Sequence, residues 1–174
     1  MSTLDLELQI AVDAESLPQG SLPKEAQFSA WAQAAVSKVL NNQKPTALTI
    51  RIVSSDESQE LNHQFRSKNR PTNVLSFPFE LPEGLPPELM QELLQEMLPE
   101  EKVLGDLAIC AEVVAKEAEQ QGKKLEDHWA HMVIHGCLHL LGYDHIKDEE
   151  AEIMEALEAE ILAELGINNP YIID

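Results

Sequence analysis

The sequence has few cysteines, few basic residues and no long apolar run. Its N-terminus lacks the basic region and apolar core of a secretory signal. The only two cysteines, Cys110 and Cys137, are therefore expected to be reduced and buried rather than paired. No apolar stretch approaches the roughly 20 residues that span a bilayer. These absences exclude a disulfide-based fold and a membrane span, and they predict a cytoplasmic protein.

Basic residues are scarce, with 12 Lys and Arg against 31 Asp and Glu, a net charge of −19. Nucleic-acid affinity comes largely from cations that contact phosphates, so the composition argues against tight binding to naked RNA. The acidic residues concentrate in 83–101 and 148–164, whereas Arg66, Lys68 and Arg70 form a locally basic stretch. These three cations can contact phosphates, or they can belong to an ordinary solvated loop.

The most informative segment, residues 131–145, is rich in histidine. It reads HMVIHGCLHLLGYDH, in which His135, His139 and His145 have the spacing H-x3-H-x5-H. Residues four apart on a helix share a face, so His135 and His139 can direct two imidazoles at one ion. Gly142 suits the left-handed turn that ends a helix, after which His145 can supply a third nitrogen. Three protein ligands and one open position are typical of a catalytic zinc site.

Other side chains in this region have alternative interpretations. Histidines on an apolar helix are often hydrogen-bonded core residues, but burying so many of them is costly unless each finds a partner. His131 lies four residues before His135, so it either competes as a ligand or orients one, and we favour the second role. His128 is expected to be solvated or to cap the helix. Cys137 lies near the far side of the helix, and Cys110 is a disfavoured fourth ligand.

The spacing also resembles that of the metzincin peptidases, H-E-x-x-H-x-x-G-x-x-H. The three histidines and the glycine match, but Gly136 stands in the place of the glutamate. That glutamate is the general base of peptide hydrolysis, and glycine cannot accept a proton. A metallopeptidase is therefore the alternative function, and glutamate at position 136 is the change that would restore a base.

Three segments resemble the YbeY family of ribosomal RNA maturation factors. They read NRPTNVLSFPFE at 69–80, LGDLAIC at 104–110 and HGCLHLLGYDH at 135–145. The resemblance covers nearly the whole chain and implies one metal-dependent hydrolase domain over residues 1–174. Residues 82–102 depart from the family pattern as a longer acidic insertion, expected to hold a loop and a short helix.

The resemblance also implies a function. It implies a single-strand-specific endoribonuclease that processes the 3′ end of small-subunit ribosomal RNA and acts in ribosome quality control. The expected partners are ribosomal RNA, the small ribosomal subunit and its basic proteins, and not DNA. By the family pattern, His135, His139 and His145 hold one zinc ion per chain, with water as the fourth ligand. Arg66 is expected to be catalytic, and Lys68 and Arg70 to bind RNA. A zinc-stabilised assembly factor without catalysis is a further alternative.

The general base is not evident from the sequence. Asp144, next to His145, and Asp106, in a glycine-aspartate turn, are candidates. For both we favour a structural role, in which they cap a turn or accept a hydrogen bond from a histidine. Arg66 would neutralise the charge that develops on the phosphoryl oxygens, because its planar fork suits phosphate. Attack by the ribose hydroxyl is an alternative to attack by water.

The hydrophobic pattern predicts an α+β fold. Strands are expected at residues 4–12, 48–52, 74–79 and 107–110. Helices are expected at residues 24–40, 56–65, 88–98, 111–121, 125–141 and 148–165. Because helices separate the strands, we expect a small four-stranded mixed sheet packed with about five helices, with the histidine helix central.

Two details of the helices are also predicted. Asp56 is expected to cap the helix that begins there, with Gln59 as its partner in a capping box. In the last helix, Ile153, Leu157 and Ile161 recur every four residues and are expected to pack inward together with Leu165. The glutamates and aspartates of that helix are expected to form a solvated face.

Overall fold

The computed structural model describes residues 4–12, 22–40, 46–78, 86–89, 102–143 and 147–167. Its strands are β1 (Leu4–Ile10), β2 (Thr46–Val53), β3 (Val74–Pro78) and β4 (Lys102–Cys110). Its helices with assigned bounds are α1 (Glu25–Leu40), α2 (Ser55–Arg66), α4 (Ala111–Gln121), α5 (Leu125–Leu140) and α6 (Asp148–Glu164). The predicted α+β class is confirmed.

The strands form one mixed sheet in the order β1-β2-β4-β3. β1, β2 and β4 are parallel, whereas β3 runs antiparallel to β4. β4 begins at Lys102, five residues earlier than the sequence pattern indicated. The added residues pair with Thr46 to Thr49 of β2 across a register shift. Their strand conformation therefore comes from a neighbouring strand and not from an alternating pattern of their own.

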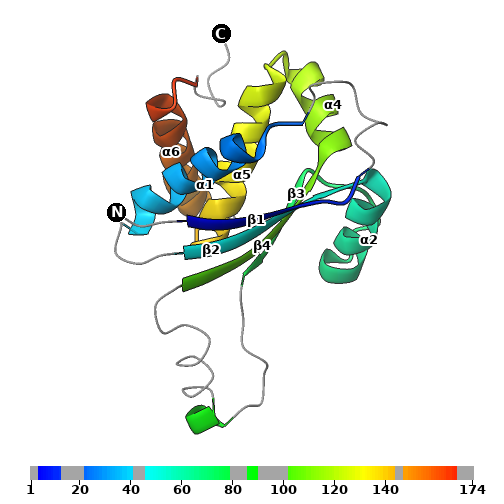
Figure 1. Cartoon of the computed structure of the whole chain (residues 1–174). Coiled ribbons are helices and arrows are strands. Elements are labelled where there is room, and N and C mark those ends of the chain that lie inside the picture. The colour runs from blue at the N-terminus through cyan, green and yellow to red at the C-terminus, as the bar shows by residue number, and fades with distance from the viewer. Residues whose placement is uncertain are drawn as a thin grey trace.

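The two faces of the sheet carry different layers. Helices α1, α5 and α6 lie on one side and α2 on the other (Figure 1). Leu48, Ile50 and Ile52 of β2 are buried in the main core with α1 and α5, because alternate residues of a strand point to opposite faces. A smaller cluster on the second face joins Leu75 of β3 to Leu61 of α2.

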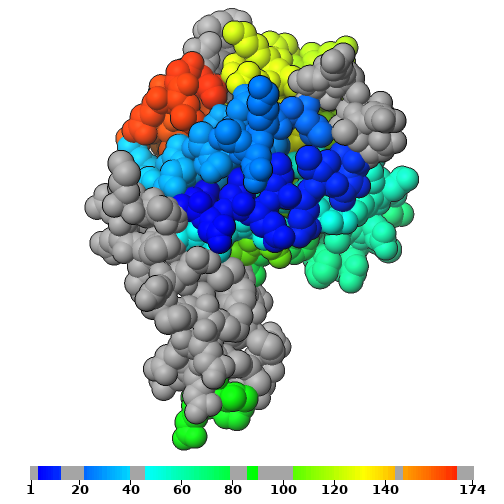
Figure 2. Space-filling model, viewed as in Figure 1, coloured from blue at the N-terminus to red at the C-terminus, as the bar shows by residue number. Residues whose placement is uncertain are grey.

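Contacts between helices hold together the layer formed by α1, α5 and α6. Figure 2 shows α6, in orange, beside α1, in light blue. At this junction Lys38 of α1 lies 2.7 Å from Glu160 and 3.0 Å from Glu164 of α6. Exposed ion pairs of this kind contribute little to stability, so buried apolar contacts, including Ile161 and Leu162 of α6, must hold this helix in place.

The predicted inward face of α6 is confirmed at Leu157 and Ile161, which pack in the core, and wrong at the other two positions. Ile153 and Leu165 are 56% and 36% exposed. The buried positions of this helix are instead Met154, Glu158, Ile161 and Leu162. The buried positions have the i, i+4, i+7, i+8 spacing of one helix face. Ile153 lies outside that face and Leu165 follows the last residue of α6, while one glutamate lies on the buried face.

One further expectation is wrong, and another falls outside the described residues. Ser54, not Asp56, caps α2, because its hydroxyl accepts a hydrogen bond from the backbone N–H of Glu57. The helix expected at 88–98 falls almost entirely outside the described residues. None of the described helices is long and apolar enough to cross a bilayer.

Candidate metal centre

Helix α5 presents four histidines. The centroids of neighbouring rings are 6.1 Å apart between His128 and His131, and 6.2 Å between His131 and His135. Between His135 and His139 they are 4.6 Å apart. Spacings of three and four residues return to one side of a helix, so the helix itself aligns the four rings. His135 and His139 are partly exposed, whereas His128 and His131 are buried.

The end of α5 follows the prediction made for Gly142. Its φ is +103°, a backbone conformation that L side chains rarely adopt. The N–H of Gly142 donates to the carbonyl of His139, and the N–H of Tyr143 donates to that of Leu138. This turn ends the helix immediately after the histidines. Asp144 and His145, the next two residues, lie outside the described residues, so the third predicted ligand is not placed.

His135 and His139 point their outer ring nitrogens at one another. Their Nε2 atoms are 3.1 Å apart. Two imidazole nitrogens bound to one tetrahedral zinc ion at 2.0–2.1 Å lie about 3.3 Å apart. The pair therefore fits a shared metal ion, with nitrogen donors of the type that zinc prefers.

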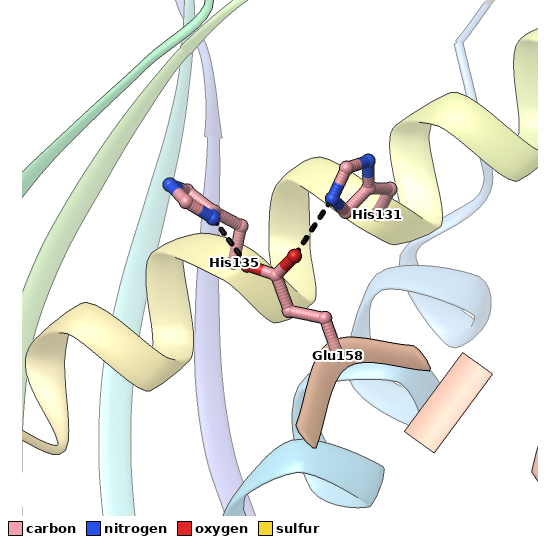
Figure 3. A group of neighbouring side chains, drawn as sticks. All are labelled: His131, His135 and Glu158. Atoms are coloured by element: carbon pink, nitrogen blue, oxygen red, sulfur yellow. Dashed lines mark hydrogen bonds and ion pairs between the residues drawn. The ribbon is translucent and has the colours of Figure 1, made fainter. Parts of the chain in front are cut away.

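A buried glutamate, Glu158 of α6, lies between His131 and His135 (Figure 3). One carboxylate oxygen accepts a hydrogen bond from Nδ1 of His135, and the other lies 3.0 Å from Nε2 of His131. Burial raises the pKa of this carboxyl, but the hydrogen bonds from His131 and His135 outweigh burial and lower the pKa to about 2. Glu158 is therefore ionised at neutral pH.

Sequence reasoning missed Glu158 by assigning the acidic residues of α6 to solvent. A signal was present, because Glu158 lies four residues after Met154 and four before Leu162, on the stripe that is buried.

Burial lowers the pKa of His131, the second partner of Glu158, and this effect outweighs the opposing effect of the Glu158 carboxylate. His131 is therefore neutral near pH 7 and can donate its Nε2–H to the carboxylate.

Two groupings of these side chains could hold an ion. His131, His135 and Glu158 offer ligand atoms within 4.8 Å of one another. However, their facing atoms are already joined by hydrogen bonds, with Nδ1 of His135 turned toward the carboxylate. An ion there would have to replace two hydrogen bonds to an ionised carboxylate, whereas an ion between His135 and His139 would replace one hydrogen bond between two imidazoles. The geometry therefore favours the outer Nε2 atoms of His135 and His139 as the metal donors, with Glu158 behind them.

His128 neither faces solvent nor caps α5, contrary to the expectation from sequence. It is 2% exposed, and its Nε2 lies 3.0 Å from a carboxylate oxygen of Glu117 in α4. The same carboxylate accepts a hydrogen bond from Asn73, just before β3. Burial raises the pKa of Glu117, but the bonds from His128 and Asn73 outweigh it and leave the pKa lowered. His128 thus ties α5 to α4 rather than facing solvent.

Asp106 is not a general base at the histidines. The next residue, Leu107, faces Gly136 of α5. Neighbouring residues of a strand point to opposite faces, so Asp106 faces away from α5. It lines an open groove of about 550 Å³ on the second face of the sheet, together with Glu7 and Arg51. The candidate base taken from the glycine-aspartate turn is therefore excluded by its position.

No contact among the described residues brings the predicted RNA-binding cations close to the histidines of α5. Arg66 is the last residue of α2, and Lys68 and Arg70 follow in the loop; all three are exposed. α2 packs against β4 and α4, on the face of the sheet opposite α5. Their roles toward RNA stay predictions.

Comparison with known proteins now decides the family. The family model described as Endoribonuclease YbeY matches residues 16–166. The chain belongs to this family. Membership supports an endoribonuclease that acts in ribosomal RNA processing, and hence a hydrolase with RNA as its partner. The chain is also similar to the solution structure of TM1509 from Thermotoga maritima, over 97% of both chains, with 24% identity and a TM-score of 0.53. That likeness supports the fold.

Gly136, the residue that separates this YbeY chain from the metzincin pattern, is packed closely against the sheet. A Cβ atom here would lie 2.7 Å from Cδ2 of Leu107 and 3.3 Å from Cγ2 of Val74. The hydroxyl of Ser76 donates to the Gly136 carbonyl at 3.4 Å. Glycine therefore lets α5 approach β3 and β4 closely. A side chain at this position would point into the sheet.

Gly136→Glu is accordingly expected to destabilise the protein and not to create a peptidase. The new carboxylate would be buried against Leu107 without a partner, at a cost of several kcal/mol. Thermal unfolding followed by circular dichroism should show a Tm lower by 10 °C or more, or no folded protein. Ala163→Ser, an exposed change on α6, is the control and should leave Tm nearly unchanged. A stable Gly136→Glu protein that cleaves peptides would contradict this account.

Proposed function

We propose that this protein is a metal-dependent endoribonuclease specific for single-stranded RNA, and that its substrate is the 3′ end of small-subunit ribosomal RNA. Quality control of ribosomes is part of the proposed role. The observation that supports metal dependence is the 3.1 Å approach of the Nε2 atoms of His135 and His139. His145 would complete a three-histidine set for one zinc ion, with water in the fourth position.

Each residue of the proposed site has a distinct part. His135 and His139 would hold the ion. A zinc ion bound there would supply Lewis acidity that activates a water or polarises a phosphoryl oxygen. Arg66 would donate to the phosphoryl oxygens as their charge increases. Lys68 and Arg70 would contact neighbouring phosphates of the RNA strand.

The chemical groups at the ends of the cleaved RNA identify the nucleophile. Attack by water leaves ordinary phosphate and hydroxyl ends, whereas attack by the ribose hydroxyl leaves a 2′,3′-cyclic phosphate. With Asp106 turned to the other face, Asp144 is the remaining aspartate candidate for a base beside the ligands. Mass spectrometry of the cleaved RNA ends separates the two routes.

The charge of the chain suggests how it reaches its substrate. A net charge of −19 weakens binding to naked RNA but suits basic protein surfaces, which the small ribosomal subunit offers. We therefore propose that the small subunit and its basic proteins are the partners that bring the enzyme to ribosomal RNA.

The proposal is tested by cleavage of a defined single-stranded RNA with and without a chelator. Zinc-loaded protein should cleave the RNA, chelation should stop cleavage, and added zinc should restore it. A peptide library should stay intact under the same conditions. Cleavage that persists after chelation would indicate a contaminating nuclease. Zinc-loaded protein that binds metal but leaves both RNA and ribosomal particles uncut would instead favour a non-catalytic assembly factor.

A further inference from the structure

We propose that Glu158 is the positioning residue of the metal centre: its carboxylate, braced by His131, holds His135 so that Nε2 of His135 faces the ion. This inference rests on the proposed function, because it assumes an ion between His135 and His139. Glu158 would not touch the ion or the RNA.

The burial of Glu158 requires an explanation. Its side chain is 0% exposed and lies on the same face of α6 as Met154 and Ile161. An ionised carboxylate among apolar neighbours is strongly unfavourable unless hydrogen bonds compensate for lost water. Both oxygens of Glu158 are engaged by imidazoles of α5. A residue needed only to pack this helix pair would be apolar, so the carboxylate points to a role at the histidines.

The hydrogen bond to Glu158 selects the tautomer of His135. Because the carboxylate only accepts, the proton of the neutral ring must be on Nδ1. The lone pair is then on Nε2, the atom that faces His139. A metal-binding histidine needs that lone pair, and a carboxylate behind the ring also raises its basicity. The contact therefore prepares His135 as a ligand before any ion arrives.

His131 restrains the carboxylate itself. Its Nε2 lies 3.0 Å from the second oxygen of Glu158. With one oxygen on each histidine, the carboxylate cannot rotate without losing a bond. His131 and His135 are one turn apart on α5, and Glu158 comes from α6, so the three residues also join the two helices (Figure 3). His131 acts on the centre through Glu158.

The test compares Glu158→Gln with Glu155→Gln, which removes the same charge from an exposed position of α6. Zinc affinity is measured by competition with a chromophoric chelator, and the metal geometry by the visible spectrum of the cobalt-loaded protein. Glu158→Gln is expected to bind one ion about 10- to 100-fold more weakly. Its cobalt spectrum should remain that of a four-coordinate site. Glu155→Gln should match the unaltered protein in both measurements.

The outcomes separate this inference from the proposed function. Unaltered protein that binds no zinc would remove the proposed function. Unaltered protein that binds zinc, with equal affinity in Glu158→Gln, would overturn the positioning role alone. Loss of all metal in Glu158→Gln, with metal retained in His139→Ala, would also overturn it, because Glu158 would then be a ligand beside His131.

A second variant covers the case in which Glu158→Gln does not fold, as judged by circular dichroism. Glu158→Asp keeps the charge but shortens the side chain, so that it cannot reach both histidines at once. It should fold and bind zinc with an affinity between those of the unaltered protein and a variant without the carboxylate. Unchanged zinc affinity in a folded Glu158→Asp protein would count against the positioning role.

Discussion

Replacing His139 by alanine is expected to remove the bound metal and, with it, RNA cleavage. The unaltered protein should carry about one zinc ion per chain, as a site with three protein ligands requires. In the variant the Nε2 atom that faces His135 is gone, and the two remaining ligands would hold an ion weakly. His139 is only partly buried, so the helix should survive the change. Elemental analysis of the purified proteins measures the metal content.

The matched control is His63→Ala, which removes an exposed histidine from α2. It should leave both metal content and RNA cleavage unchanged. Equal metal in His139→Ala and the unaltered protein would refute the pair of Nε2 donors. Among the described residues, the other group of close ligand atoms is His131, His135 and Glu158, and it would then be the next candidate.

Arg66→Ala is expected to reduce RNA cleavage by roughly 10²-fold or more, with metal content and fold intact, because a donor to the developing phosphoryl charge is lost. A guanidinium is always protonated and does not bind the ion. Arg66 is exposed and outside both apolar clusters, so its removal should hardly change the free energy of unfolding. Arg66→Lys should recover only part of the loss, since an ammonium lacks the two-pronged geometry.

Single-turnover rates at saturating RNA identify the role of Arg66. A loss that persists at saturation indicates an interaction made in the transition state, whereas a loss that vanishes indicates binding alone. Arg70→Ala is the control, and its defect should vanish at saturation. Full activity of Arg66→Ala would remove this residue from the site.

Much of the fold could be predicted because its signals are local. α4 spans the expected residues, and α5 begins where expected and ends one residue early. Gly122 and Gly142, which follow the ends of these helices, both have the positive φ that suits glycine at that place. β2 alternates buried and partly exposed residues, as its sequence pattern indicated. The start of β4 was missed because its first residues form a strand only by pairing with β2.

The metal centre likewise combines features set by local sequence with features set by tertiary packing. Sequence by itself determined that His135 and His139 share a helix face, because a separation of four residues is a property of the helix and needs no partner. It also determined the family through three short motifs. Only the tertiary structure decided that Glu158, 23 residues after His135, lies behind that ring. It likewise decided that Asp106 faces the other side of the sheet and that Gly136 lies against Leu107 of β4. These features depend on how each helix is rotated against its neighbours, and that rotation is set by packing over the whole core.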